Sequence, residues 1–287
     1  MGLPIKYIIL KFGDIDVLKQ AMDNGDVNFI IDAAYKPGKY QVEYGFGNIA
    51  YYLIFKQNRE IGKNEDFRQA VDHTLKRKII KDIIAHSLGI DEVELLSNHH
   101  LYNLLSESPG QDISDANYDE VKAKKFWIKA KESLNANNIN EPIFNIAPIS
   151  NNDVYNDLIK NIIEQLSKVG IKAKNVGENK ESADALISTV NFNTPEFLYL
   201  NLHSKSAMGI WGYNNPFMDS ILNDDMDTTT FKEIQRVLSK EHIFIPLIRH
   251  GIAVTHINAL DTKSRHRTTE PLFGPDVAIF EFKQPET

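Results

Sequence analysis

The feature that most constrains the fold is the alternation of strand-like and helix-like segments along the chain of 287 residues. Residues 5–12 and 27–33 have the clustered β-branched and aromatic residues typical of strands. Between them we expect a short helix that begins after Asp14 and ends with a left-handed cap at Asn24-Gly25. This β-α-β pattern favours a mixed α/β sheet. Further strands are expected at residues 50–55, 142–149, 171–176, 183–190 and 245–257.

Capping residues and apolar spacing locate the helices. The clearest helix is expected to run from Asn64, its cap, to Gly89, with apolar residues at helical spacing throughout. Asp119 opens another helix, and Gly170 ends the one that begins near residue 153. Residues 35–48, rich in glycine and tyrosine, are interpreted as a loop or a connection between lobes, and residues 97–117 as irregular.

The segment GIWGYNNPFMDSIL, residues 209–222, places a turn directly before a short helix. The pattern puts Phe217, Ile221 and Leu222 on one helical face, with Asp219 on the opposite side. It contains none of the usual arrangements of catalytic groups. The segment therefore indicates a role in recognition rather than in chemistry.

The composition excludes several classes of protein. The net charge of −7 argues against a nucleic-acid binder, which normally carries a basic surface. The absence of cysteine excludes disulfide scaffolds, thiolate metal sites and cysteine nucleophiles. No apolar run approaches the ~20 residues that a membrane span needs. The first residues lack the pattern of a signal peptide and lead directly into a strand, so we expect the chain to begin within a fold.

The motifs of common enzymes and cofactor sites are missing from the sequence, which has no GxSxG, HExxH, Walker or GxGxxG pattern. Nine histidines are present, but His99 and His100 are adjacent and would point in different directions. We therefore expect no enzymatic activity, no metal site and no cofactor.

An acidic run precedes the last helix. Asp224, Asp225 and Asp227 resemble a calcium loop only loosely, since the glycine and the glutamate that such a loop needs are absent. The run is better explained as a loop that leads to Thr230 and Glu233, which have the spacing of a capping box.

Aromatic residues concentrate in two segments, residues 35–52 and 192–217. One explanation is packing in a core or an interface. The other is a cleft lined by aromatic rings and a few amides, as is common in sites for small molecules and peptides. Both explanations remain open for the group as a whole.

Four segments, in order, resemble the bacterial extracellular solute-binding proteins of family 5, the oligopeptide-, dipeptide- and nickel-binding components of ABC importers. The first is residues 16–30, where Asn28 replaces the final acid of the family's pattern. The second is YYLIFKQN followed by residues 66–89, where Lys76 stands in place of the usual aspartate. The residues of this second segment that match the family signature are Arg68, Gln69, Ala70 and Arg77.

The third and fourth segments extend the resemblance to about residue 250. NYDEVKAKKFWIKA, residues 117–130, leads into a helix in which Gln165, Leu166, Gly170 and Ile171 match the family. GYNNPFMDSIL is similar to the family's N-P-x-x-D-x-L pattern and precedes the helix that ends in IFIPLI.

The resemblance implies an α/β, periplasmic-binding-protein-like (type II) fold of two lobes, with the second lobe complete and the first partial. Residues 1–58 would be the end of the first lobe and the hinge, residues 59–246 the second lobe, and residues 247–287 a tail that returns to the first. Residues 16 to about 250 carry the resemblance.

The resemblance also implies a site. In peptide-binding relatives an acid four positions before a proline holds the ammonium group of the ligand, and the position matching it here, before Pro195, is Asn191. An amide supplies no formal charge and cannot form an ion pair with an ammonium group. The resemblance therefore favours a neutral or anionic solute as the ligand over a peptide with a free amine. The ligand-binding residues implied are Asn191, Phe192, Asn193, Trp211 and Tyr213.

Two functions follow as alternatives. The first is an extracytoplasmic substrate-binding component that closes its lobes on a peptide or another small solute and delivers it to the permease subunits of an ABC importer, with no chemistry and no nucleic acid. The second is the solute-sensing domain of a cytoplasmic transcription regulator. A third, weaker alternative is an unrelated α/β hydrolase or transferase.

Overall fold

The computed structural model describes residues 15–31, 35, 39–88, 118–190, 192, 194–206, 212–223, 227–257, 260–261 and 281–282. The chain divides into two compact units, of which the first comprises Met1–Gly47, Leu88–Glu94 and His250–Thr287. The second comprises Asn48–Ser87 and Leu95–Arg249. The lobe boundaries inferred from the resemblance stay a prediction.

In the first unit, helix α1 (Ile15–Asp23) leads to strand β1 (Phe29–Ile31). Gly25 ends the helix with φ of +81°, a conformation that glycine adopts without steric cost. The predicted short helix and its left-handed cap are confirmed. β1 pairs antiparallel with the end of β6 (Phe244–His256), and β7 (Leu260–Asp261) pairs antiparallel with β8 (Glu281–Phe282). The predicted strand at residues 5–12 lies outside the described residues.

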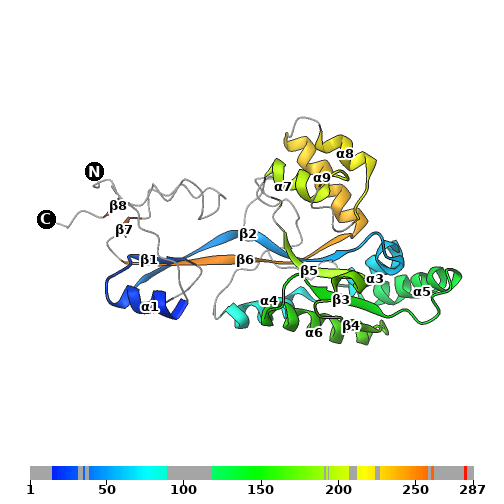
Figure 1. The fold of residues 1–287 in the computed structure, drawn as a ribbon, viewed down its shortest axis with the longest axis horizontal. Coiled ribbons are helices and arrows are strands. Elements are labelled where there is room, and N and C mark those ends of the chain that lie inside the picture. The colour runs from blue at the N-terminus through cyan, green and yellow to red at the C-terminus, as the bar shows by residue number, and fades with distance from the viewer. Residues whose placement is uncertain are drawn as a thin grey trace. The chain divides into compact units, whose positions relative to one another are not determined.

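The second unit is built on a mixed sheet (Figure 1). Its strands are the first part of β6, then β2 (Gln41–Phe55), β5 (Ala185–Val190), β3 (Phe144–Pro148) and β4 (Ala173–Asn175), in this spatial order. β5 runs antiparallel to β2 and parallel to β3, and β3 runs parallel to β4. The strands predicted at residues 142–149, 171–176 and 183–190 are therefore confirmed within a few residues, and the strand predicted at residues 50–55 is the last part of β2.

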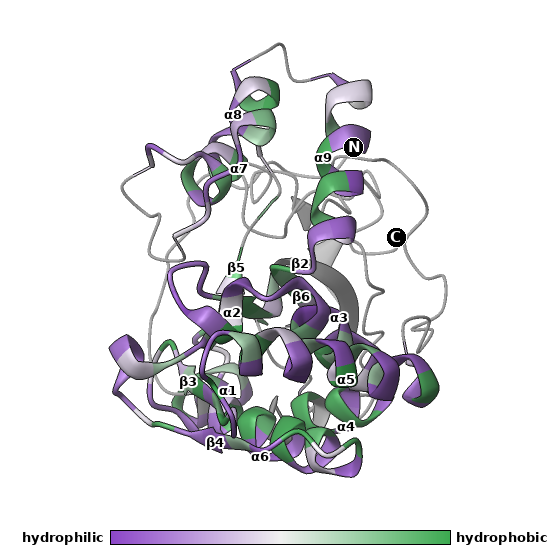
Figure 2. Ribbon diagram, turned by 90° about the vertical axis from the view of Figure 1, so that its right-hand side faces the viewer, coloured by the Kyte–Doolittle hydropathy of each residue, from purple (hydrophilic) through white to green (hydrophobic). Residues whose placement is uncertain are grey.

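The helices of the second unit are α2 (Glu60–Lys63), α3 (Glu65–Thr74), α4 (Arg77–Leu88), α5 (Glu120–Ala136), α6 (Asp153–Lys168), α7 (Pro195–Leu202), α8 (Pro216–Leu222) and α9 (Thr228–Glu241). Of these, α3 and α6 are amphipathic and bury apolar residues, and Figure 2 shows hydrophobic and hydrophilic residues mixed along the helices. A 3₁₀ turn covers Lys180–Ser182. α3 packs on α5, and α6 contacts β3, β4 and β5.

Two groups of buried side chains hold this unit together. Phe55, Phe67 and Phe144 pack ring against ring, and Trp127 of α5 joins them through Phe67. A larger cluster gathers side chains from β2, β5, α7, α8 and α9. Burial of apolar surface on this scale is the main favourable contribution to folding.

The helix expected between Asn64 and Gly89 is instead two helices, α3 and α4, interrupted at Leu75 and Lys76. Asn64 caps α3 as predicted, since its Oδ1 accepts a hydrogen bond from the amide of Phe67 at 2.9 Å. The interruption frees carbonyls that the buried Arg77 needs. Its guanidinium donates to the carbonyls of Asp72 and Leu75.

Three other expectations were wrong in detail. Strand β2 begins at Gln41, so much of the expected loop at residues 35–48 is strand. Asp227, not Thr230, caps α9, because its carboxylate accepts the Thr230 amide at 2.8 Å. In α8 the buried side chains are Met218, Ile221 and Leu222, whereas Phe217 is 50% exposed.

Candidate functional site

Of the five ligand-binding residues predicted from the sequence, the structure describes Phe192 and Tyr213. Asn191, Asn193 and Trp211 lie outside the described residues. Phe192 is 2% exposed and packs edge-on against Tyr52 and Phe244, with ring centroids 5.4 and 5.7 Å apart. The ring of Tyr213 is 6.0 Å from the same Phe244. The structure thus brings Phe192 and Tyr213 together around one core residue, and their contact with a ligand stays a prediction.

The hydroxyl of Tyr213 belongs to a polar network at the end of α9. It donates to Glu241 Oε2 at 2.8 Å, and Asn215 Nδ2 donates to Glu241 Oε1 at 2.7 Å. Burial, together with the Glu241 carboxylate, raises the pKa of Tyr213 far above its usual value. Tyr213 is therefore a neutral hydrogen-bond donor that ties the segment before α8 to the end of α9.

The backbone at the end of α9 is held as well. Arg68 Nε donates to the carbonyl of Glu241 at 2.8 Å, and its Nη1 donates to the carbonyl of Gly62 at 3.1 Å. Burial lowers the pKa of Arg68. The next residue, His242, has φ of 53° in the left-handed region and ends the helix. Its ring Nδ1 lies 2.9 Å from Asp72 Oδ2.

Asp72 also pairs with Arg77, and both side chains are almost fully buried, at 3% and 1% exposed. Burial alone would raise the pKa of the Asp72 carboxyl, but the Arg77 guanidinium and the His242 ring outweigh it and hold this pKa well below its usual range. Arg77 Nε further donates to the carbonyl of Pro246 in β6 at 3.3 Å. Arg68 and Arg77, two residues of the family signature, thus fasten α3 and α4 to the α9–β6 connection.

The polar residues of the fourth sequence segment, GYNNPFMDSIL, also form hydrogen bonds within the protein. Asn215 Oδ1 accepts the amides of Phe217 and Met218 and so caps α8. Asp219 accepts hydrogen bonds from both the amide and the hydroxyl of Ser204, which follows α7. Burial opposes ionisation of Asp219, but the Ser204 donors outweigh it and lower its pKa. The motif residues therefore join α7 to α8.

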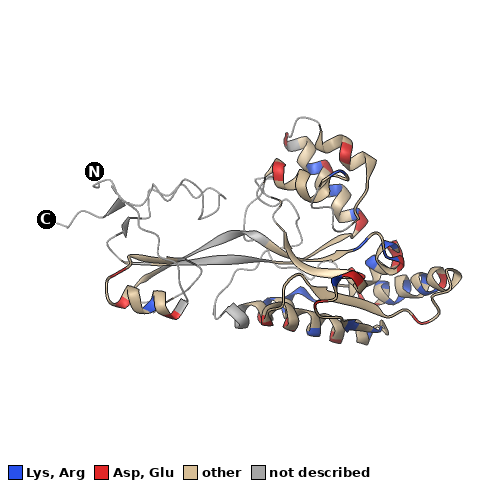
Figure 3. Cartoon of the chain, viewed as in Figure 1, with Lys and Arg blue, Asp and Glu red and all other residues tan. Residues whose placement is uncertain are grey.

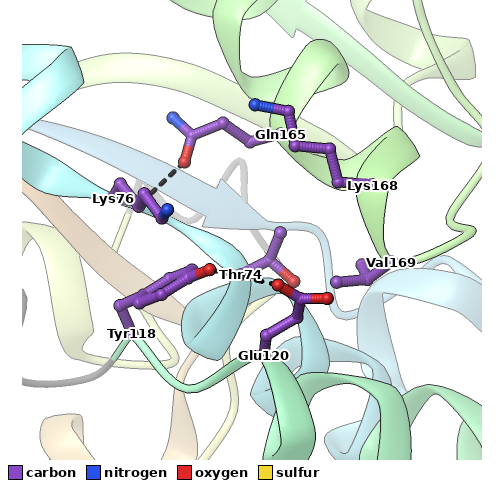
Figure 4. Close-up of a pocket in the computed structure, with 7 residues that line it drawn as sticks. All are labelled: Thr74, Lys76, Tyr118, Glu120, Gln165, Lys168 and Val169. Atoms are coloured by element: carbon purple, nitrogen blue, oxygen red, sulfur yellow. Dashed lines mark hydrogen bonds between the residues drawn. The ribbon is translucent and has the colours of Figure 1, made fainter.

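A small pocket opens where α3 ends, α5 begins and α6 ends (Figure 4). Its lining residues are Thr74, Lys76, Tyr118, Glu120, Gln165, Lys168 and Val169. The amide of Lys76 donates to Gln165 Oε1 at 2.6 Å, and the Lys76 ammonium lies 4.4 Å from the Tyr118 ring centroid. The enclosed space holds little more than one water molecule. The pocket is too small for a peptide.

The part of the chain that the structure describes contains neither a candidate metal site nor a candidate membrane-spanning helix. No group of three histidine, aspartate or glutamate side chains there could hold a metal ion. No helix within those residues is long and apolar enough to cross a membrane. The described side chains instead form a polar framework of hydrogen bonds at the end of α9, which includes Tyr213, one of the predicted ligand residues.

Sequence reasoning missed the centre of this framework, formed by Asp72, Glu241 and His242. Asp72 is 170 residues from its histidine partner, and no local pattern links them. The available signal in the sequence was the position of Asp72 on the buried side of an amphipathic helix, because a buried carboxylate requires a charged or hydrogen-bonding partner.

A sequence model described as bacterial extracellular solute-binding proteins, family 5 Middle, matches residues 3–222. No curated protein sequence matches the chain. Several solved structures, in contrast, are similar to the chain. NikZ from Campylobacter jejuni in complex with Ni(L-His) is 17% identical, with a TM-score of 0.67, and the match covers 93% of this chain and 60% of that one.

Two further solved structures are similar. The ABC transporter substrate binding protein CtaP from Listeria monocytogenes is 14% identical, with a TM-score of 0.69 and coverage of 94% of this chain and 59% of that one. The oligopeptide-binding protein AppA from Bacillus subtilis, in complex with a nonapeptide, is 18% identical, with a TM-score of 0.62 and the same coverage. At these identities the likeness shows the fold alone. The predicted α/β, periplasmic-binding-protein-like fold is confirmed, and the chain spans about three fifths of the length of these proteins.

Proposed function

The chain belongs to the bacterial extracellular solute-binding proteins of family 5, and we propose from this that it captures a peptide or another small solute for an ABC-type importer. The match of the family sequence model to residues 3–222 carries the proposal. Proteins of this family are extracytoplasmic and bind solutes rather than transform them. We accordingly propose that the chain has no catalytic activity and acts outside the cytoplasm with the permease subunits of an importer.

The framework at the end of α9 supports this role. In these proteins a ligand is held by closure of lobes, which requires rigid bodies joined by a hinge. The Arg68 and Arg77 contacts and the Glu241 bridge make the second unit such a body. Tyr213, one of the predicted ligand residues, is joined to this body by its hydrogen bond to Glu241.

We propose Asn191, Phe192, Asn193, Trp211 and Tyr213 as the ligand-binding residues. The amide at Asn191 favours a solute without a free ammonium group, since a buried ammonium requires a charged partner. NikZ and AppA, the relatives named above, were solved with Ni(L-His) and with a nonapeptide. Both ligand classes belong in a search for the solute of this chain.

The regulator function is not proposed, because no finding from the structure or from the comparisons supports it. A hydrolase or transferase function is not proposed either.

The test is a thermal-shift screen of the purified chain against free peptides, peptides with acetylated amino termini, Ni²⁺ with histidine, and small anionic solutes. A true ligand at one hundred times its Kd raises Tm by about 5 °C. We expect blocked peptides or anionic solutes to act more strongly than free peptides. Asn191→Asp should reverse this order. If neither the wild-type chain nor Asn191→Asp responds to any of these compounds, the proposal is wrong.

A further inference from the structure

The outward side of α5 combines exposed aliphatic side chains with lysines. The inward side of this helix is formed by Ala123, Trp127, Ala130 and Leu134. Val121 and Ile128 lie seven residues apart, on the side away from these four, and are 79% and 54% exposed. Aliphatic side chains with this much exposure contribute little to folding. The same side is therefore available for an external contact.

Lysines flank this aliphatic pair on both sides. At 100° per residue, Lys124 and Lys131 fall along one flank of the pair, and Lys125 and Lys129 fall along the other. All four are exposed, and Figure 3 shows the lysines along α5. An apolar stripe bordered by lysines is the arrangement of helices that lie on membrane surfaces.

Three of these ammonium groups are not neutralised by neighbours. Lys124 pairs with Glu120 at 2.6 Å. In the described part of the chain, no carboxylate lies within ion-pair distance of Lys125, Lys129 or Lys131. Lys129 and Lys131 instead lie over the rings of Phe126 and Trp127, which leave their charge intact.

Helix α5 contains five lysines and two glutamates and is therefore positively charged, although the chain as a whole carries a net charge of −7. Glu132 is the acid on the outward side. An anionic surface would repel most of this chain and attract α5, and each lysine near such a surface contributes about a fivefold gain in partitioning.

We propose that the outward side of α5, defined by Val121, Ile128 and the lysines that flank them, docks on an anionic phospholipid surface. The contact would orient the second unit at the membrane where an importer resides. It uses none of the proposed ligand residues, so it stands or fails separately from solute binding.

The experiment is flotation of the purified chain with vesicles of phosphatidylcholine alone and of phosphatidylcholine mixed with phosphatidylglycerol. We expect binding to the mixed vesicles at low salt, little binding to neutral vesicles, and loss of binding as salt screens the charges. Lys125→Gln with Lys129→Gln should lower partitioning at least tenfold. Ile128→Gln should lower it by a smaller factor.

The matched control is Lys232→Gln with Lys240→Gln, which removes the same charge from exposed positions of α9. Equal losses in the two double variants would show that only net charge matters and would overturn the proposal. Absence of binding to the mixed vesicles at low salt would overturn it as well. Circular dichroism of each variant separates loss of docking from loss of folding.

Discussion

The Nδ1 atom of His242 lies 2.9 Å from Oδ2 of Asp72, which joins the end of α9 to the end of α3 across 170 residues of sequence. The same carboxylate pairs with Arg77, whose side chain is 1% exposed. One buried acid therefore satisfies two cationic or hydrogen-bonding partners. The position where α9 turns into β6 depends on it.

Asp72→Asn is expected to lower the free energy of unfolding at pH 7 by about 3–5 kcal/mol, because Arg77 stays buried without its counter-charge. Urea unfolding measures this loss. Asp82→Asn, which changes an exposed acid on α4, should change the free energy of unfolding by less than about 0.5 kcal/mol. Equal effects of the two substitutions would contradict the role given to Asp72.

The pH dependence follows from the direction of the Asp72 shift. Its pKa in the folded protein lies below the ordinary 3.8, so the ionised group stabilises the fold above about pH 4. This contribution is lost as the pH falls further, toward the folded pKa. The gap in Tm between the wild type and Asp72→Asn should therefore narrow in buffers more acidic than about pH 4.

Tyr213→Phe tests whether Tyr213 supports the framework or also contacts a solute. The ring stays in place, but the hydrogen bond to Glu241 is lost, which should cost about 1–2 kcal/mol of unfolding free energy. Tyr199→Phe makes the same change on a ring that is 37% exposed and should cost less than about 0.5 kcal/mol.

Titration with an identified solute completes that test. If Tyr213 acts only through Glu241, affinity in Tyr213→Phe falls no further than in Glu241→Gln, which weakens the same bond from the other side. A larger loss in Tyr213→Phe would assign its hydroxyl to the solute.

Local signals were sufficient to locate much of the fold. Asn64, Asp119 and Gly170 act within three or four residues of themselves, so their effects on helix ends can be seen in the sequence, and the structure confirms all three. The break at Leu75 could not be predicted in this way. It depends on Arg77, whose need for carbonyl acceptors is visible only once the side chain is known to be buried.

The candidate site was less predictable for a related reason. The sequence offered Phe192 and Tyr213 as aromatic residues of a segment, and an aromatic ring serves a core as readily as a cleft. Their shared neighbour Phe244 and the Glu241 contact come from a distant part of the chain. Sequence spacing carries no information about such contacts.

Asp219→Ala should loosen the connection between α7 and α8. The carboxylate accepts the Ser204 amide at 2.8 Å as well as the Ser204 hydroxyl, and loss of both should lower the unfolding free energy by about 1–3 kcal/mol. Asp219→Asn keeps one acceptor and should lose about half as much. Asp157→Ala, at an exposed position of α6, is the control and should have little effect on urea unfolding.

Gly62→Ala addresses the close approach of α2 to the strand that precedes it. A Cβ at this position would lie 2.2 Å from the carbonyl oxygen of Lys56 and 2.8 Å from that of Asp184. Both contacts are with backbone atoms, which cannot rotate away, and the carbonyl of Asp184 accepts the Lys56 amide at 2.9 Å. The substitution should therefore lower the free energy of unfolding by about 3 kcal/mol or more.

The control for this prediction is Gly177→Ala, where a Cβ meets nothing within 4 Å but the backbone has φ of +58°. Its cost should be only the ~1–2 kcal/mol of a left-handed residue with a side chain. Urea unfolding of both variants separates steric conflict from backbone strain. A smaller loss for Gly62→Ala than for Gly177→Ala would mean that α2 can move away from Lys56, and the rigidity attributed to this part of the second unit would have to be abandoned.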